Sequence, residues 1–207
     1  MRRVFGIIFM IIGALLVAGA LMLYLSNEKE DQQAGTSSDE ILIQIQQEIQ
    51  QIISEEAPTE SPLDLIPPEL LSPEDLVMTE RMVNGYSCIG YVSIGELNLE
   101  LPVISDWSYQ KLRVSPCRFS GTVRGEDLVI MAHSYKSHFG RLSTLSEGSA
   151  VQFTDMDGKT WCYKVVAMDV LDPTAVDEMI AGEYDLTLFS CTPTGKHRVT
   201  VRCDLVE

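Results

Sequence analysis

The feature that most restricts the fold of this 207-residue chain is an uncharged, almost continuous apolar run at residues 4–25. A helix of this length crosses the roughly 30 Å hydrocarbon core of a bilayer and satisfies its own backbone hydrogen bonds there. Arg2 and Arg3 precede the run, and acidic residues follow it. Since basic residues stay on the cytoplasmic side, we expect residues 1–26 to form a single-pass anchor with a cytoplasmic amino terminus.

A cleaved secretory signal peptide is the alternative interpretation of the same run. Ala18, Gly19 and Ala20 have the small-residue spacing of a cleavage site. We favour a retained anchor, because the apolar residues continue past that point as far as Leu25. In both interpretations the rest of the chain is expected to be extracytoplasmic.

Residues 27–80 have the composition of a linker. They hold fourteen acidic residues against a single lysine, are rich in glutamine and proline, and lack the aromatic residues of a core. Isoleucines recur at helical spacing over residues 40–55, which predicts a short helix. That helix would dock on the folded domain, dock on a second copy, or stay solvated. The prolines between residues 58 and 73 predict an extended spacer.

From residue 81 onward, short β-branched runs alternate with turn signals, a pattern typical of an all-β barrel or sandwich. Asp157 and Gly158 give a strong hairpin signal. The net charge of −15 argues against nucleic-acid binding, which needs a concentration of basic residues. Strands are expected at 89–94, 99–104, 128–133, 150–154, 161–170, 186–191 and 198–204, and short helices at 108–114, 139–145 and 174–181.

Five cysteines, at positions 88, 117, 162, 191 and 203, are too few and too irregularly spaced for a disulfide framework. Their odd number leaves at least one thiol free, and outside the membrane a free thiol is more often retained for its reactivity than for packing. Cys88, Cys117, Cys162 and Cys203 lie in or beside apolar runs, so we interpret them as packing residues.

Cys191 ends an apolar strand at the mouth of a loop, and Arg198 opens the final strand seven residues later. Arg198 shares its side of that strand with Thr200 and Arg202, so it is expected to point away from the core. A cation beside a thiol lowers the thiol's pKa and stabilises the oxyanion that forms when a thiolate attacks a carbonyl. Taken alone, these two residues fit a buried structural cysteine equally well.

His133 ends another apolar strand and is the preferred acid-base candidate. Cysteine acyl transfer needs a group that titrates near pH 7, to protonate a leaving amine and deprotonate the incoming nucleophile. The competitors are His197, which has the opposite strand parity to Arg198, and His138, which falls in a loop or helix start. We therefore rank His133 first.

These motifs together resemble the sortase family. A strand ends in Met131, Ala132 and His133, a later T-L-x-[TS]-C strand ends at Cys191, and an arginine-led V-x-V strand begins at Arg198. The resemblance covers about residues 81–207, which we assign to the catalytic domain. It implies an all-β fold, an eight-stranded sortase-type β-barrel with short helices, preceded by a transmembrane helix and a stalk.

The resemblance also implies a cysteine transpeptidase. Cys191 would attack a C-terminal sorting signal, often LPxTG-like, and form a thioacyl enzyme, with His133 as acid and then base and Arg198 as oxyanion stabiliser. Ser190 and Thr192, which flank the cysteine, are expected to contact substrate. The implied partners are secreted proteins with sorting signals and an amine of a peptidoglycan precursor or a pilin, and the implied location is the cell membrane.

No cofactor is expected. Loop carboxylates bind calcium in some relatives, but Glu147, Asp155 and Asp157 are as easily solvated turn residues, so we assign no metal. Two other functions stay open. The same three residues would make a membrane-bound cysteine peptidase if water took the acyl group, and a degenerate sortase fold would serve as a binding module with an inert Cys191.

Overall fold

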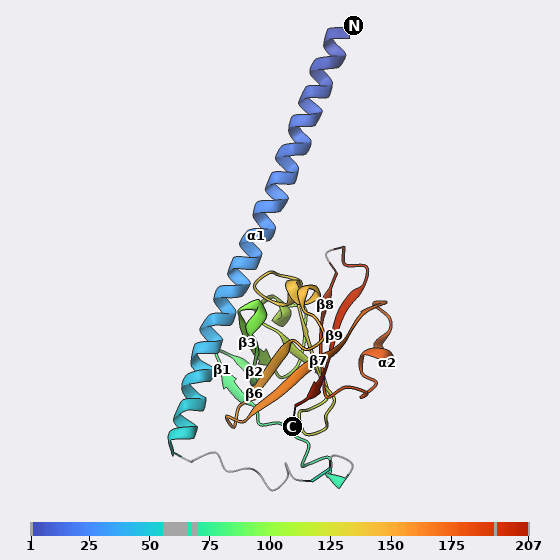
Figure 1. The fold of residues 1–207 in the computed structure, drawn as a ribbon. Coiled ribbons are helices and arrows are strands. Elements are labelled where there is room, and N and C mark those ends of the chain that lie inside the picture. Colours follow the sequence, from blue (N-terminus) through green and yellow to red (C-terminus); the bar gives the residue numbers. More distant parts are fainter. Residues whose placement is uncertain (1, 56–65, 68–69, 193, 207) are drawn as a thin grey trace.

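In a computed structural model, a long amino-terminal helix stands beside a closed β-barrel (Figure 1). The structure describes residues 2–55, 66–67, 70–192 and 194–206. Most of the proline-rich spacer that the sequence analysis expects between helix and barrel falls outside the described residues.

Helix α1 covers Arg2–Glu55 and joins two segments that the sequence analysis treats as separate elements. Its 54 residues make it about 80 Å long at a rise of 1.5 Å per residue. Residues 27–39, expected to belong to an irregular linker, are helical as well. No proline interrupts them, and the turns that follow pack against the barrel, so tertiary contacts stabilise a continuous helix.

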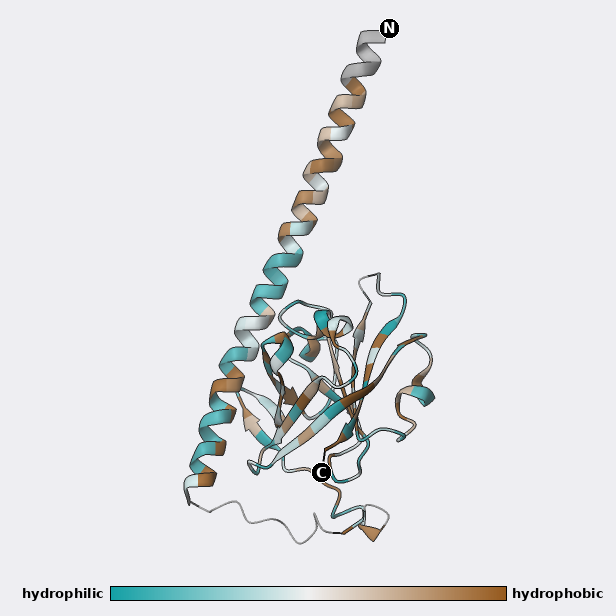
Figure 2. Cartoon of the chain, viewed as in Figure 1, coloured by the Kyte–Doolittle hydropathy of each residue, from teal (hydrophilic) through white to brown (hydrophobic). Residues whose placement is uncertain are grey.

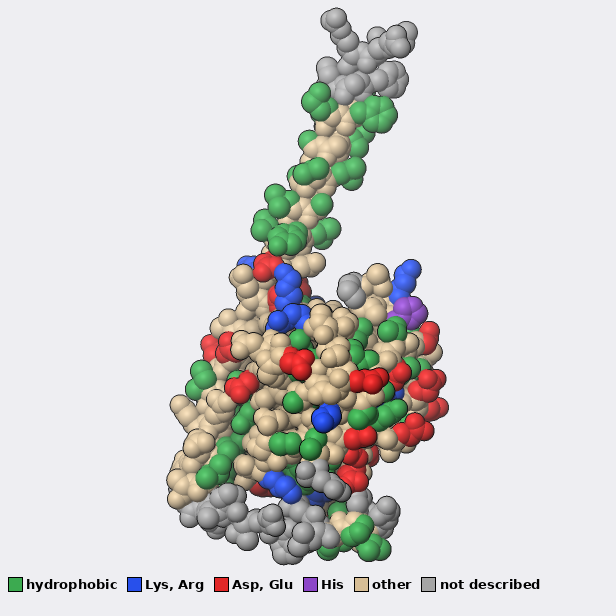
Figure 3. Space-filling view, viewed as in Figure 1, with side chains coloured by type: hydrophobic (Ala, Val, Ile, Leu, Met, Phe, Trp, Pro, Cys, Tyr) green, Lys and Arg blue, Asp and Glu red, His purple; other side chains and the backbone are tan. Residues whose placement is uncertain are grey.

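The first half of α1 has the character of a membrane span. Its large apolar side chains between Ile8 and Leu25 are exposed, and the helix is long and apolar enough there to cross a membrane. Figure 2 shows this half as mainly hydrophobic, with a change to hydrophilic residues where the helix reaches the barrel. Figure 3 shows acidic and basic side chains gathered at that junction.

The second half of α1 docks on the barrel. Ile41, Ile45 and Ile49 are almost completely buried and share a hydrophobic cluster with barrel residues such as Ile104 and Met156. Of the three situations that the isoleucine spacing leaves open, the structure thus shows docking on the folded domain.

The remaining elements are short. The strands are β1 (Arg81–Val83), β2 (Tyr86–Ile94), β3 (Leu99–Ile104), β4 (Cys117–Ser120), β5 (Leu128–Ala132), β6 (Ala150–Asp155), β7 (Thr160–Leu171), β8 (Leu186–Cys191) and β9 (Arg198–Leu205). The helical turns are η3 (Gly95–Leu97), η4 (Lys111–Arg113), η5 (Phe139–Thr144) and α2 (Val176–Met179). All seven expected strands are present, whereas β1 and β4 are unforeseen because they are only three and four residues long.

Eight strands close the barrel. Their order is β2-β3-β4-β5-β8-β9-β7-β6, and β6 pairs back with β2, while β1, among the described strands, pairs with β2 alone. The expected eight-stranded barrel is therefore confirmed. Neighbouring strands are antiparallel except for β3 with β4 and β5 with β8. The second parallel pair matters for function, because parallel neighbours end at the same edge of a sheet.

The hairpin between β6 and β7 forms at Asp157 and Gly158, as expected, with Gly158 at a φ of +84°. The Asp155 carboxylate closes it by accepting hydrogen bonds from the backbone N–H groups of Asp157 and Lys159 and from Trp161 Nε1. Asp155 is thus a buried turn residue. Among the described residues, no group of three or more His, Cys, Asp or Glu side chains is placed to hold a metal ion.

Candidate active site

Strand register brings the three predicted catalytic residues together. Ala132 pairs with Ser190 on the parallel strands β5 and β8, so the next residues, His133 just after β5 and Cys191 at the end of β8, lie side by side. Cys191 in turn lies directly opposite Arg198 on the antiparallel strands β8 and β9. Cβ atoms of such cross-strand partners are typically about 4.5–5.5 Å apart. Thiol, imidazole and guanidinium therefore share one stretch of the barrel rim.

All three residues line a cavity of about 320 Å³. Aromatic side chains form much of its wall: Phe119 and Phe189 meet edge to face with ring centroids 5.4 Å apart, and Trp107 lies 6.0 Å from Phe119. Another wall is formed by Asp172, Pro173, Ala175, Val176 and Met179. The site is thus a mainly apolar groove with a nucleophile, a base and a cation at its rim.

The sequence patterns did not predict that aromatic side chains line the groove. Phe189 carried a usable signal, because it stands two positions before Cys191 and therefore on the same side of β8. Trp107 and Phe119 carried none, since one lies in a loop and the other on the unforeseen strand β4.

His133 is half-buried, and its ring stacks on that of Tyr135 with centroids 4.4 Å apart and planes 14° from parallel. Burial lowers the pKa of His133, the positive charge of Arg113 lowers it further, and the negative charge of Glu30 opposes both. The neutral imidazole is favoured at neutral pH as a result, and this form can accept a proton.

The five cysteines differ in their exposure to solvent. Cys191 is partly exposed in the groove, whereas Cys88, Cys117 and Cys203 are buried, and burial raises the pKa of each to about 12. Cys162 is exposed, which corrects its interpretation as a packing residue. It occupies an outward position of β7 between two buried aromatic residues, so strand alternation turns it to solvent.

Arg198 is held by its own loop. Its Nη1 donates to the carbonyl oxygens of Gly195 (3.4 Å) and His197 (3.2 Å). A guanidinium has five N–H donors, so further donors can serve a substrate oxygen. Across the groove, hydrogen bonds from Thr174 lower the pKa of Asp172, and the charges of His197 and Arg198 add to this. Arg198 thus faces the groove, as its strand parity predicts.

Ser190 and Thr192 make structural hydrogen bonds. Ser190 is 2% exposed, and its Oγ donates to the carbonyl oxygen of Phe139 (3.1 Å), which ties η5 to β8. The backbone N–H of Thr192 donates to His197 O (2.9 Å), and its Oγ1 accepts from His197 N (3.2 Å), closing the β8–β9 loop. Substrate contact by either residue stays a prediction, and the Ser190 hydroxyl is directed to the backbone.

The two competing histidines lie outside the groove. His138 is fully buried under α1, and burial, followed by the neighbouring His133, lowers its pKa to about 4. His197 is exposed in the β8–β9 loop. Neither belongs to the cavity lining, so His133 is the one of the three histidines that lines the groove, and its catalytic role stays a prediction.

Arg202 is a supporting residue that the sequence analysis does not single out. It is 4% exposed although it shares the outward side of β9 with Arg198, because the segment before β8 covers it. Its guanidinium donates to Thr187 Oγ1 (3.1 Å), Met179 O (3.3 Å) and Glu178 O (2.9 Å). Arg202 therefore fixes the α2 wall of the groove to β8 and β9.

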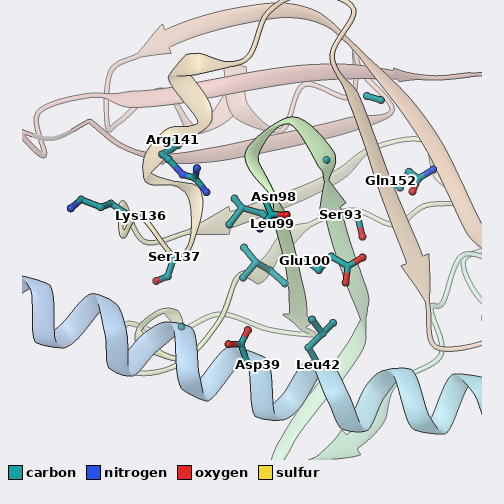
Figure 4. A pocket seen from close by; sticks show the side chains of 14 residues that line it. Asp39, Leu42, Ser93, Asn98, Leu99, Glu100, Lys136, Ser137, Arg141 and Gln152 are labelled. Atoms are coloured by element: carbon teal, nitrogen blue, oxygen red, sulfur yellow. The ribbon is translucent and has the colours of Figure 1, made fainter.

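A second, larger cavity of about 790 Å³ lies between α1, the β2–β3 turn and η5 (Figure 4). Its lining is polar, with Asp39 and Glu100 on one side and Lys136 and Arg141 on another. Cys191, His133 and Arg198 line the other cavity, so the smaller groove is the candidate active site.

Comparisons with known proteins agree with this arrangement. A family model described as the sortase domain matches residues 92–206. Sortase C1 from Streptococcus suis has 28% identity and a TM-score of 0.52, covering 58% of this chain and 73% of that chain. The Pilus Island 1 sortase C2 of Group B Streptococcus has 25% identity and a TM-score of 0.53, covering 79% and 97%.

A sortase D5 transpeptidase from Clostridium perfringens has 16% identity and a TM-score of 0.59, covering 83% of this chain and 99% of that chain, and this likeness concerns the fold alone. No curated protein sequence matches the chain. The family model covers more than half of this chain, and the strands within the matched residues 92–206 belong to the closed barrel. The protein therefore belongs to the sortase family.

Proposed function

We propose that this protein is a membrane-anchored sortase that cleaves a C-terminal sorting signal and transfers the acyl fragment to an amine. Family membership implies a cysteine transpeptidase. The observation that supports these roles best is the register that places His133 and Arg198 on either side of Cys191 at the groove.

In the first half-reaction, neutral His133 takes the proton of the Cys191 thiol, and the resulting thiolate attacks the scissile carbonyl carbon and forms a C–S bond. Arg198 donates hydrogen bonds to the oxyanion of the tetrahedral intermediate. When the intermediate collapses, the C–N bond breaks, and the imidazolium of His133 protonates the departing amine. The products are a thioacyl enzyme and the free carboxyl-terminal fragment.

In the second half-reaction, an incoming amine attacks the thioester carbonyl. His133, now neutral, takes the proton that the amine loses, and returns it to the Cys191 sulfur as the thiolate leaves. A new amide replaces the one that was broken. Thiol, imidazole and guanidinium supply nucleophile, proton transfer and charge stabilisation, so this scheme needs no cofactor.

The groove supports an extended apolar peptide as donor. Its wall of Trp107, Phe119 and Phe189 offers rings on which apolar side chains of an LPxTG-like signal pack. The acceptor amine in our proposal comes from a peptidoglycan precursor or from a pilin.

Helix α1 supports the location at the membrane. Its exposed apolar half is long enough to span a bilayer, and Arg2 and Arg3 favour a cytoplasmic amino terminus. The catalytic domain would then lie outside the membrane, where secreted proteins carry their sorting signals.

Mass spectrometry of the full chain in detergent micelles tests this function. The protein is incubated with a panel of sorting-signal peptides, with and without oligoglycine or a diamino acid. We expect an amine-ligated product from the parent and none from Cys191→Ala. Cys162→Ala removes an exposed thiol outside the groove and is the matched control.

The outcomes separate the alternatives. Hydrolysed peptide that stays unligated at high amine concentration would identify a cysteine peptidase. A Cys191→Ala variant as active as the parent would exclude the proposed nucleophile. No acyl adduct with any peptide, together with ordinary thiol reactivity of Cys191, would favour the binding module.

A further inference from the structure

The loop that follows His133 is held by the membrane-proximal part of α1. Ser137, four residues after His133, donates its backbone N–H to Asp31 Oδ1 (2.9 Å) and its Oγ to the Asp31 carbonyl oxygen (3.0 Å). Gly35 allows the close approach, because a Cβ added there would lie 3.2 Å from Ser137 Cβ. Figure 4 shows Ser137 on its loop beside the helix.

A second contact reaches the histidine itself. Tyr135 stacks on the His133 ring, and its hydroxyl donates to Glu30 Oε2 (3.3 Å). The tyrosine is therefore a direct bridge between α1 and the imidazole. Ring orientation about the Cβ–Cγ bond is otherwise soft, so a parallel neighbour restricts it.

A third contact lies one turn further along α1. Ser38 is fully buried, its Oγ donates to Val114 O (2.8 Å), and the same oxygen lies 3.3 Å from His138 Nε2. Asp31, Gly35 and Ser38 follow one another at intervals of four and three residues, which places them on one face of the helix, and Glu30 adjoins Asp31. This part of α1 thus contacts Tyr135, Ser137 and His138 in the loop after His133, and also the backbone of Val114.

We propose that this face of α1, residues 30–38, positions the catalytic imidazole, with Tyr135 and Asp31 as positioning residues. The inference rests on the function proposed above. It means that the helix which anchors the protein also completes the active site, so a catalytic domain released from residues 30–38 is a poorer enzyme.

The charges around His133 allow a readout that is independent of substrate. Arg113 on η4 lowers the pKa of His133, as burial does, and Glu30 on α1 raises it. His138 lies beyond Tyr135, and Cys191 and Arg198 lie on the neighbouring strands. Removing the Glu30 charge should lower the pKa of His133, whereas removing the Tyr135 ring should raise it by relieving burial.

The test measures the titration of the histidine imidazoles by NMR in the full chain in micelles. Each of the three signals is assigned with a His→Gln variant. Glu30→Gln should lower the pKa of His133, Tyr135→Leu should raise it, and Tyr135→Phe should restore the stacked environment. Asp39→Asn, on the same helix but exposed at the second cavity, is the matched control and should leave the pKa of His133 unchanged.

Kinetics supply the second readout. With a peptide that the parent ligates, Tyr135→Leu and Asp31→Ala should each lower kcat about tenfold and change KM by less than about twofold, because orientation and not binding is lost. Tyr135→Phe keeps the stacked ring but loses the hydroxyl that contacts Glu30, so it should recover only part of the kcat that Tyr135→Leu loses. Circular dichroism checks that each variant keeps its fold.

Two outcomes would overturn the inference while the proposed function stands. One is a pKa of His133 that is unchanged in Glu30→Gln and in Tyr135→Leu. The other is a kcat for Asp31→Ala that equals the kcat for Asp39→Asn. A parent that ligates no peptide but shows the expected titration shifts would refute the proposed function and leave the positioning of His133 supported.

Discussion

Cys191 and Arg198 face each other as cross-strand partners on β8 and β9. A strand slip of one residue would turn one of them to the other side of the barrel wall. In the loop between the two strands, hydrogen bonds between Thr192 and His197 hold this register. The distance between nucleophile and guanidinium is thus set by main-chain hydrogen bonds.

Replacing Arg198 with lysine should abolish most activity. A lysine keeps the charge but loses the planar set of donors that Arg198 offers to an oxyanion, so we expect kcat/KM to fall by about 10²-fold. Steady-state kinetics of the full chain measure this. Lys196→Ala removes an exposed charge from the same loop and should leave kcat/KM within about twofold. An active Arg198→Lys enzyme would contradict the oxyanion role.

The aromatic wall should contribute to both substrate binding and stability. Phe119→Leu and Phe189→Leu each enlarge the groove, so KM for a sorting-signal peptide should rise several-fold. The edge-to-face pair predicts a coupling of about 0.5–1.5 kcal/mol in the free energy of unfolding. A double-mutant cycle by urea denaturation measures it, and purely additive single changes would show that the two rings do not interact.

Loss of Arg202 should loosen the α2 wall. Arg202→Met leaves the carbonyl oxygens of Glu178 and of the buried Met179 without this donor, and we expect the free energy of unfolding to fall by about 2–4 kcal/mol. Asp169 also lies 3.3 Å from Nε but is 44% exposed, so Asp169→Asn should cost far less. Limited proteolysis should cut residues 172–185 faster in Arg202→Met, and equal rates would refute the supporting role.

His138 should make stability pH-dependent. Burial lowers its pKa to about 4, whereas an unfolded histidine titrates near about 6.5. The stability that this depressed pKa contributes is fully present above pH 6.5 and is lost as pH falls toward 4, since only the unfolded chain takes up the proton in that window. We expect a loss of about 3 kcal/mol.

Chemical denaturation at several pH values between 7 and 4 measures this dependence. His138→Gln should be less stable at pH 7 and should show a flatter profile. His197→Gln, at an exposed histidine, should keep the parent's slope. If the free energy of unfolding of the parent did not change between pH 6.5 and 4, folding would not lower the pKa of His138.

Part of the site could be predicted from the sequence, because strand periodicity and motif order are properties of short sequence segments. Alternation predicted the strands around His133 and Cys191 and the outward direction of Arg198, and turn chemistry predicted the hairpin at Gly158. The apolar run at residues 4–25 predicted a spanning helix for the same reason, since the length and polarity of a segment are properties of the segment itself.

Only the tertiary structure decided which distant segments meet. The parallel pairing of β5 with β8 places His133 beside Cys191, and no local pattern encodes that pairing. Docking against the barrel makes residues 27–39 helical despite their linker-like composition, because packing supplies the stabilisation that their propensity lacks. The contacts of Asp31 with Ser137 join residues 106 positions apart, a separation across which sequence spacing carries no information.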